Sequence, residues 1–158
     1  MGPEAKFYKE IKRKLPEFSW IRIENISLLG TPDLLVCNTS GHFCTVELKV
    51  TKGKKILLSP HQIAFHSKHP KNTFIMVKTL GPLSSKTFSI SMFHGSRVRE
   101  LATRGLELEA CYSGLDACRL AIERVALMFT VYNRLNFFVP TLSTIHAFAL
   151  LVRSWTGP

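Results

Sequence analysis

Acidic residues are scarce in this chain. Its 158 residues include 11 Asp and Glu against 21 Lys and Arg, which gives a formal net charge of +10. Such an excess favours a polyanionic partner, with nucleic acid ahead of an anionic membrane surface. A basic surface that only keeps the protein in solution has the same composition, so charge alone does not choose among the three.

Closely spaced cysteine pairs are also missing. None of Cys37, Cys44, Cys111 and Cys118 forms the C-x-x-C pair that indicates a zinc site. The N-terminal segment mixes lysines with acids and has no continuous apolar stretch, so it does not look like a secretory signal. We therefore expect a reducing, intracellular setting, with Cys37 and Cys44 as small hydrophobic residues rather than a disulfide.

No apolar run is both long and unbroken. A membrane-spanning helix needs about 20 apolar residues, whereas the apolar stretch from Phe137 to Val152 is interrupted by Pro140 and contains His146. We therefore expect no membrane segment. Because this tail differs in character from what precedes it, we expect one domain at residues 1–128 and a C-terminal extension of unassigned role at 129–158.

The remaining pattern is that of a folded domain without internal repeats, and 46% of its residues are hydrophobic. Apolar periodicity and turn residues predict helices at 4–15, 60–68, 97–103 and 115–128, and strands at 20–24, 33–37, 42–50, 73–77 and 87–93. Ser59, Pro60 and Gln62 predict a capping box for the second helix, and Ser113 is expected to cap the last one. The strands and helices together predict an α/β fold with a mixed central β-sheet flanked by helices.

The strand at 42–50 carries the most informative residues. Side chains on a strand alternate between its two faces, so Glu47 and Lys49 share one face while apolar residues occupy the other. A lone Glu-x-Lys is equally well explained as an exposed ion pair. However, the preceding strand of the same hairpin begins at Asp33, which brings a second carboxylate close to Glu47. Two carboxylates repel each other unless a cation lies between them, and oxygen ligands suit Mg²⁺ or Mn²⁺.

These motifs, Pro32-Asp33 followed by Glu47-Leu48-Lys49, resemble the PD-(D/E)XK nuclease superfamily. The match improves when other segments are added in chain order: Glu4-x-x-Phe7, Arg22-Ile23-Glu24, Gly30-Thr31-Pro32-Asp33 and Leu58-Ser59-Pro60-x-Gln62. With these, residues 4–80 look like the VRR-NUC and phage-type nucleases of that superfamily. The resemblance implies a PD-(D/E)XK restriction-endonuclease-like core.

The resemblance also implies roles for individual residues. Asp33, Glu47 and the backbone carbonyl of Leu48 would bind the catalytic metal, while Lys49 would orient the attacking water and stabilise charge on the phosphate. Glu4 would hold a second metal or its water shell, although an ordinary acid at a helix start explains Glu4 about as well. Glu10 is the alternative acid on the same helix.

Other residues are expected around this centre. Gln62 would face the site, with helix capping as the competing explanation, and Gly30 would permit an unusual backbone conformation or the close approach of a phosphate. Arg22 would touch substrate unless it forms a salt-bridged strand pair with Glu24. The basic candidates for phosphate contacts are Lys52, Lys54 and Lys55, with Lys12, Arg13 and Lys14, each of which could equally be a solvated surface charge. The histidines at 61, 66, 69 and 94 are interpreted as surface or core residues.

The function implied by the resemblance is a Mg²⁺- or Mn²⁺-dependent DNA endonuclease. It would be of phage or mobile-element type, act on branched or flap DNA as a homodimer, and work in the cytoplasm, which for a phage protein is that of the host. Three alternatives stay open at this point. They are an RNA endonuclease of the same fold, a non-catalytic nucleic-acid-binding module, and a membrane-associated protein anchored by residues 137–152.

Overall fold

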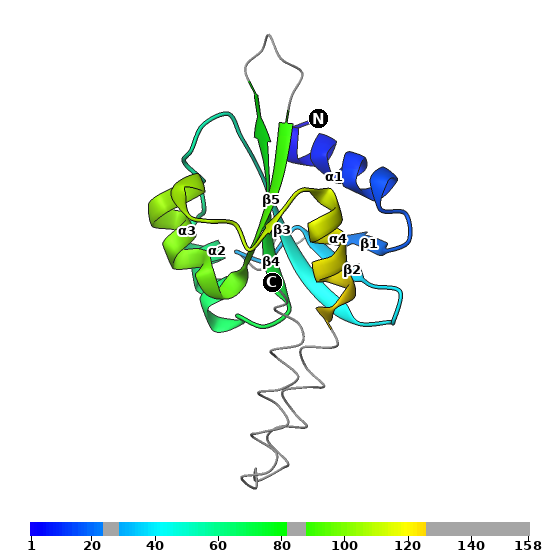
Figure 1. The fold of residues 1–158 in the computed structure, drawn as a ribbon. Coiled ribbons are helices and arrows are strands. Elements are labelled where there is room, and N and C mark those ends of the chain that lie inside the picture. The colour runs from blue at the N-terminus through cyan, green and yellow to red at the C-terminus, as the bar shows by residue number, and fades with distance from the viewer. Residues whose placement is uncertain (24–28, 82–87, 126–158) are drawn as a thin grey trace, which may run out of the picture. The chain divides into compact units, whose positions relative to one another are not determined.

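A sheet of six strands forms the centre of the molecule (Figure 1). The computed structural model describes residues 1–23, 29–81 and 88–125. The strands follow one another across the sheet in chain order: β1 (Ser19–Arg22), β2 (Leu34–Cys37), β3 (Phe43–Thr51), β4 (Thr73–Leu80), β5 (Phe88–His94) and β6 (Tyr112–Ser113). All neighbours are antiparallel except β3 and β4, which are parallel. The carboxyl ends of β3 and β4 therefore lie at the same end of the sheet.

Helices cover both faces of this sheet, as Figure 1 shows. The helices are α1 (Pro3–Lys14), α2 (Pro60–Lys68), α3 (Val98–Arg104) and α4 (Leu115–Glu123), with short 3₁₀ turns η1 (Gly95–Arg97) and η2 (Gly105–Glu107). On one face, Phe7 and Ile11 of α1 and Ile122 of α4 pack on the inward residues of the strands. On the other face, Val98 and Leu101 of α3 pack on β4 and β5. The predicted α/β fold with a mixed sheet flanked by helices is confirmed.

The order of elements also agrees with the sequence. A helix is followed by a three-strand meander, a second helix and a further strand, as predicted, and α2 supplies the crossover that the parallel pair of β3 and β4 requires. The capping box at Ser59 is present. One prediction is wrong: Gly114, not Ser113, is the N-cap of α4, because Ser113 is paired with Ser91 in the sheet.

Asn38 fixes the turn between β2 and β3. Its side-chain oxygen accepts hydrogen bonds from the backbone N–H groups of Ser40 and His42, at 3.1 and 2.8 Å. Its side-chain nitrogen donates to the carbonyl oxygens of Ile122 and Glu123 at the end of α4, both at 3.1 Å. The turn is thereby fixed both locally and to α4, which sets the register of the hairpin that carries Asp33 and Glu47.

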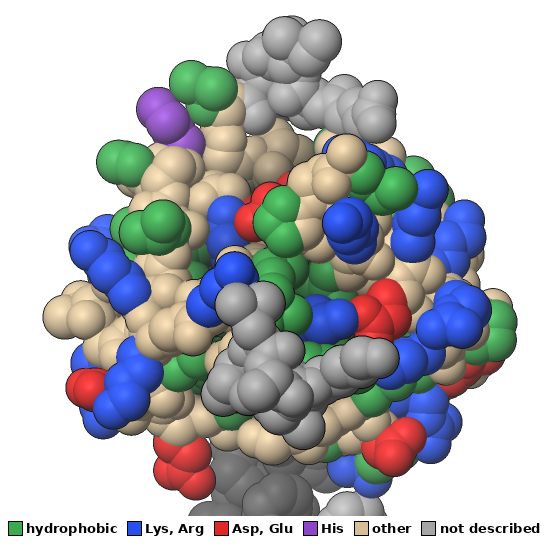
Figure 2. Space-filling view, turned by 90° about the horizontal axis from the view of Figure 1, so that it is seen from above, with side chains coloured by type: hydrophobic (Ala, Val, Ile, Leu, Met, Phe, Trp, Pro, Cys, Tyr) green, Lys and Arg blue, Asp and Glu red, His purple; other side chains and the backbone are tan. Residues whose placement is uncertain are grey.

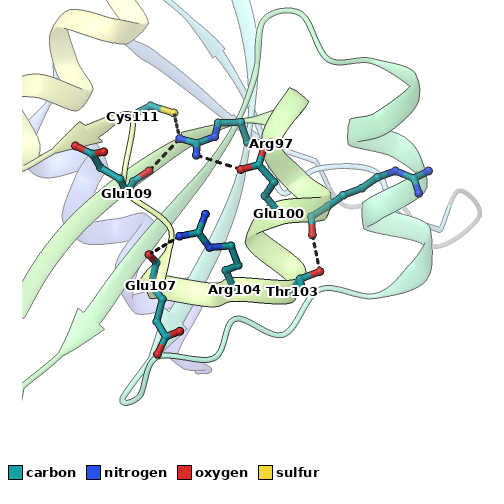
Figure 3. A network of polar contacts seen from close by, with 8 residues as sticks. Arg97, Glu100, Thr103, Arg104, Glu107, Glu109 and Cys111 are labelled. Atoms are coloured by element: carbon teal, nitrogen blue, oxygen red, sulfur yellow. Dashed lines mark hydrogen bonds and ion pairs between the residues drawn. The ribbon is translucent and has the colours of Figure 1, made fainter.

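Arg97 ties α3 to the segment that leads into β6 (Figure 3). Its guanidinium donates to the carbonyl oxygen of Glu109 at 3.0 Å and pairs with Glu100 at 3.3 Å, and it lies 3.8 Å from the Cys111 sulfur. Arg104 donates to the carbonyl oxygen of Glu107 at the end of η2. These contacts are structural and lie on the helical layer formed by α3.

The four thiols are free, as expected. Cys44 and Cys118 are buried, and burial raises the pKa of each to about 12, so neither is a reactive thiolate near neutral pH. In the described part of the chain, no helix has the length and apolar character needed to cross a membrane. Residues 1–125 form one compact unit. The predicted boundary at 128 and the stretch at 137–152 lie outside the described residues.

Candidate active site

Asp33 and Glu47 are brought together by the β2–β3 hairpin. Leu34 lies opposite Val46, so one further step along the register places Asp33 opposite Glu47 on the same face of the sheet. The Asp33 carboxylate accepts a hydrogen bond from the backbone N–H of Leu48 at 2.8 Å. The Asp33 side chain therefore supplies the acceptor at the end of the β2–β3 hydrogen-bond ladder, and this bond holds Asp33 beside Glu47.

Glu47 is almost completely enclosed, with 1% of its surface exposed. One carboxylate oxygen, Oε1, lies 3.0 Å from the Lys49 ammonium and accepts a hydrogen bond from the side-chain amide of Gln62. The other oxygen, Oε2, is buried without a hydrogen-bond partner among the described residues. A buried carboxylate oxygen without a partner is costly, so this position calls for a cation or a proton.

The pKa of Glu47 is raised to about 7 from an ordinary value of 4.5. Burial is the main cause, and the negative charge of Asp33 adds to it, while Lys49 opposes the shift. Glu4, an exposed residue in the first turn of α1, is near enough to raise the pKa slightly further. The carboxylates of Asp33, Glu47 and Glu4 therefore create a negative electrostatic potential, which favours a bound cation at Glu47.

This shift predicts a pH-dependent stability for the metal-free protein. Between pH 4.5 and about 7 the folded protein retains a proton on Glu47 that the unfolded chain has released, so stability falls as the pH rises through this window. The change amounts to about 3 kcal/mol in the free energy of unfolding. Urea unfolding in EDTA at several pH values measures it. The Glu47→Gln variant should lack this component, and parallel pH profiles for the two proteins would contradict the prediction.

The residues present fit a divalent cation. Within the described ranges no group of three or more His, Cys, Asp and Glu side chains could hold a metal unaided. Mg²⁺ does not need such a group, because it is usually bound by one or two carboxylates, with water and substrate phosphate completing its shell. The unpartnered Oε2 of Glu47 beside Asp33 supplies that kind of donor set.

The backbone of Leu48 also points toward this position. The N–H and C=O of one strand residue point to the same neighbouring strand, and the Leu48 N–H points to Asp33. The register places Pro32 opposite Leu48, and proline has no N–H to donate. The Leu48 carbonyl therefore faces the end of β2 at a place where that strand offers no backbone donor. This consequence of Pro32 was not recognised from the sequence, although the Pro-Asp pair was its signal.

Gln62 makes the contacts expected from both explanations considered for it. Its side-chain oxygen accepts from the backbone N–H of Ser59 at 2.9 Å, and its own backbone N–H donates to the Ser59 hydroxyl at 3.2 Å. Its amide nitrogen donates to Glu47. The capping box thus holds the amide in position, so the two explanations are compatible.

The basic loop after β3 is held in place by η2. The Lys54 carbonyl accepts a hydrogen bond from the Leu106 N–H at 2.7 Å, and the Lys54 ammonium pairs with Glu107 at 3.3 Å on the exposed surface. Lys52 and Lys55 are also exposed. This loop leaves from the end of the sheet at which β4 ends. Figure 2 shows Lys and Arg side chains spread over that end of the molecule, with fewer Asp and Glu side chains among them.

Two other candidates, Arg22 and Glu10, lie away from Glu47. Arg22 follows Trp20 on the α1 face of the sheet, opposite to the face that carries Glu47 and Lys49, and Glu24 lies outside the described residues. Glu10 pairs with Lys14 at 3.0 Å and also with Lys78, so it is committed elsewhere.

His66 is a core residue, as interpreted from the sequence. It is fully buried and its ring contacts the Thr73 hydroxyl. Burial first, and then the charge of Lys49, lower its pKa to about 4, so it stays neutral near pH 7.

Comparisons with known proteins give a limited likeness. The chain matches no protein-family model and no curated protein. Among solved structures it is similar to that of Hjc, a Holliday junction resolvase from the archaeal hyperthermophile Archaeoglobus fulgidus, with 16% identity and a TM-score of 0.39. The alignment covers 58% of this chain and 76% of the resolvase chain. The resemblance to the PD-(D/E)XK superfamily, and the narrower one to VRR-NUC and phage-type nucleases, stay predictions.

Proposed function

We propose that this chain is a metal-dependent endonuclease that hydrolyses phosphodiester bonds in DNA. The observation that carries the proposal is the buried, unpartnered oxygen of Glu47 beside Asp33, with the Lys49 ammonium on the other oxygen. A protein that only binds nucleic acid has no reason to place two carboxylates beside its phosphate path, because they would repel the ligand.

Each residue of the site has a role in this proposal. Asp33, Glu47 and the Leu48 carbonyl would hold Mg²⁺ or Mn²⁺, with Glu4 on α1 near a second ion or its waters. A divalent ion bound there would polarise the phosphate and lower the pKa of a bound water. Lys49, held by Glu47 at 3.0 Å, can hydrogen-bond the attacking water and stabilise the charge that grows on the phosphate. Gln62 keeps the Glu47 carboxylate oriented.

The substrate form that the motif resemblance implies is branched or flap DNA, cut by a small basic enzyme of phage or mobile-element type in the cytoplasm. Lys52, Lys54 and Lys55 would bind phosphates without reading sequence. Arg22 would make a more distant contact on the α1 side of the sheet, because its side chain is on the face opposite to Glu47.

A cleavage assay tests the proposal. Linear, flapped, four-way-junction and single-stranded DNA, with matched RNA versions, are incubated with the protein in Mg²⁺ or Mn²⁺ and in EDTA. We expect cutting of at least one DNA substrate that requires the metal, with a flap or junction preferred. Cutting of RNA alone would move the proposal to an RNA endonuclease. The absence of any metal-dependent cutting would contradict it.

A homodimer is part of this proposal, and a part of the sheet that the described helices leave exposed supports it. Ile21 and Phe43 are 47% and 52% exposed, and they share with Leu35 the face that carries Asp33 and Glu47. The described core on that face, built by α2 and α3, involves β4 and β5. Exposed apolar residues grouped in this way are typical of an interface, and a twofold dimer would bring two sites to one substrate.

Phe43→Asp should therefore yield a monomer, because a charge on this face cannot be buried in a dimer. Light scattering after size exclusion measures the mass. The matched control is Leu120→Asp, since Leu120 is 42% exposed on α4, at the opposite face of the sheet. A wild-type monomer, or a dimer that survives Phe43→Asp, would contradict the assignment of this face.

A further inference from the structure

Phe88, the first residue of β5, presents an aromatic ring at the surface and is 41% exposed. Two ammonium groups lie near its ring, with Lys14 Nζ at 4.6 Å and Lys78 Nζ at 4.2 Å from the ring centroid. An exposed aromatic residue among lysines is the combination with which proteins bind single-stranded nucleic acid, because every base offers a flat face and every nucleotide a phosphate.

The surface beside this ring is hollowed. An open cavity of about 370 Å³ lies there, and its lining includes Lys14, Phe88, Ile90, Ser113 and Leu115. β6 pairs only with Ser91 and Met92 of β5. In the described chain, the residues at the start of β5 therefore have no strand on the β6 side. Such an edge offers backbone N–H and C=O groups to a ligand. The cavity therefore combines apolar, cationic and hydrogen-bonding surface.

The charge of this patch is positive. Glu10 is the acid that bridges the two lysines. Burial alone would raise the pKa of Glu10, but the hydrogen bonds from Lys78 and Lys14 outweigh it and the pKa is lowered. Glu10 is thus ionised near neutral pH, and one carboxylate against two ammonium groups leaves an excess of one positive charge. This charge complements a phosphate.

The position of the patch relative to Glu47 restricts what can occupy it. Lys78 lies opposite Val50, the residue after Lys49, in the parallel β3–β4 pair, and paired strands are about 4.8 Å apart. Lys49 and Lys78 are on opposite faces of the sheet, close to the edge at which β3 and β4 end. A DNA strand that runs from Lys49 to Lys78 must bend sharply around this end of the sheet. Duplex DNA, with a persistence length of about 150 base pairs, resists such a bend, whereas unpaired nucleotides do not.

We propose that Phe88, Lys14 and Lys78 form a subsite for an unpaired nucleotide of the DNA strand that leaves the Glu47 site. The base stacks on the Phe88 ring and the adjacent phosphate contacts the lysines. This inference rests on the proposed nuclease function, and it gives that function a physical reason to prefer flapped or branched DNA.

Binding without cleavage tests the subsite. Fluorescence anisotropy in EDTA compares a short labelled oligothymidylate with a blunt duplex, using wild type, Phe88→Ala, Phe88→Trp and the control Leu120→Ala. We expect Phe88→Ala to weaken binding of the single strand by about five-fold or more, the effect of losing one stacked base, with little change for the duplex. Phe88→Trp should restore the affinity, and Leu120→Ala should behave as wild type.

Two results would overturn the subsite. One is wild-type affinity of Phe88→Ala for the single strand, and the other is an equal loss for single strand and duplex, which would indicate general electrostatic or folding effects. A second measurement, photo-crosslinking to iodouracil DNA, should label the peptide that contains Phe88. Because both measurements are made in EDTA, they report on the subsite even if metal-dependent cleavage fails, so the two proposals can be rejected separately.

Discussion

Replacement of Glu47 by glutamine is expected to reduce DNA cleavage by roughly 10³-fold or more without unfolding the protein. Glutamine has the shape of glutamate and retains an oxygen that can accept from Lys49 and Gln62, which hold Oε1 in the wild type. It lacks the negative charge that a divalent ion requires. The loss should therefore fall on metal-dependent chemistry and leave the packing of β3 in place.

The same substitution is expected to stabilise the metal-free protein at pH 8. At that pH the wild type must keep a buried carboxylate whose pKa is about 7 in its charged form next to Asp33, and glutamine removes this cost. Added Mn²⁺ should raise the melting temperature of the wild type and have little effect on Glu47→Gln, because ligand binding to the folded state stabilises it by mass action. A single variant thus separates catalysis from stability.

The control for this experiment is Glu100→Gln. Glu100 is an exposed acid on α3 that pairs with Arg97, so its substitution removes the same charge far from β3. It should retain wild-type cleavage and an unchanged response to Mn²⁺. Near wild-type cleavage by Glu47→Gln, or an equal loss in the two variants, would remove Glu47 from the site.

Local patterns were sufficient to predict the hairpin and its faces. Strand alternation put Glu47 and Lys49 together, and a short turn around Asn38 left one possible neighbour for Asp33. The start of α2 was also predictable, because a capping box involves only residues within one turn. These features depend on separations of a few residues, for which the sequence carries a direct signal.

Features set by distant pairing could not be predicted in the same way. Ser113 has the side chain of a helix cap, but its pairing with Ser91 places it in the sheet, and tertiary contacts override such local preferences. Glu10 looked available to the site until Lys78, 68 residues away in the chain, was seen to bind it. The face on which Arg22 lies depends on the register of β1 against β2, which its own segment does not reveal.

Gly30 links the loop before Asp33 to the first turn of α2. Its φ of +86° lies in the region that L side chains rarely adopt, as the sequence suggested. A Cβ built there would approach the backbone carbonyl of His61 closer than 3.0 Å, a separation that real Cβ atoms essentially never show. The close approach that the structure shows is therefore to α2. The contact lies next to Gln62 in sequence and three residues before Asp33.

Gly30→Ala is expected to lower the free energy of unfolding by about 3 kcal/mol or more, as the sum of backbone strain and overlap with α2. The chain offers a matched control in Gly41→Ala, since Gly41 has a φ of +79° but nothing within 4 Å of its Cβ position. That variant should lose only the strain, about 1–2 kcal/mol. Urea unfolding of the two variants measures the difference.

The difference between the two glycines also has a consequence for catalysis. If α2 moves to relieve the overlap, the Gln62 amide shifts away from Glu47, and cleavage should fall in Gly30→Ala under conditions in which it is still folded. Gly41 lies at the far end of the hairpin, so Gly41→Ala should cut as wild type does. Equal stability losses with equal cleavage in the two variants would mean that the contact between Gly30 and α2 does not position the site.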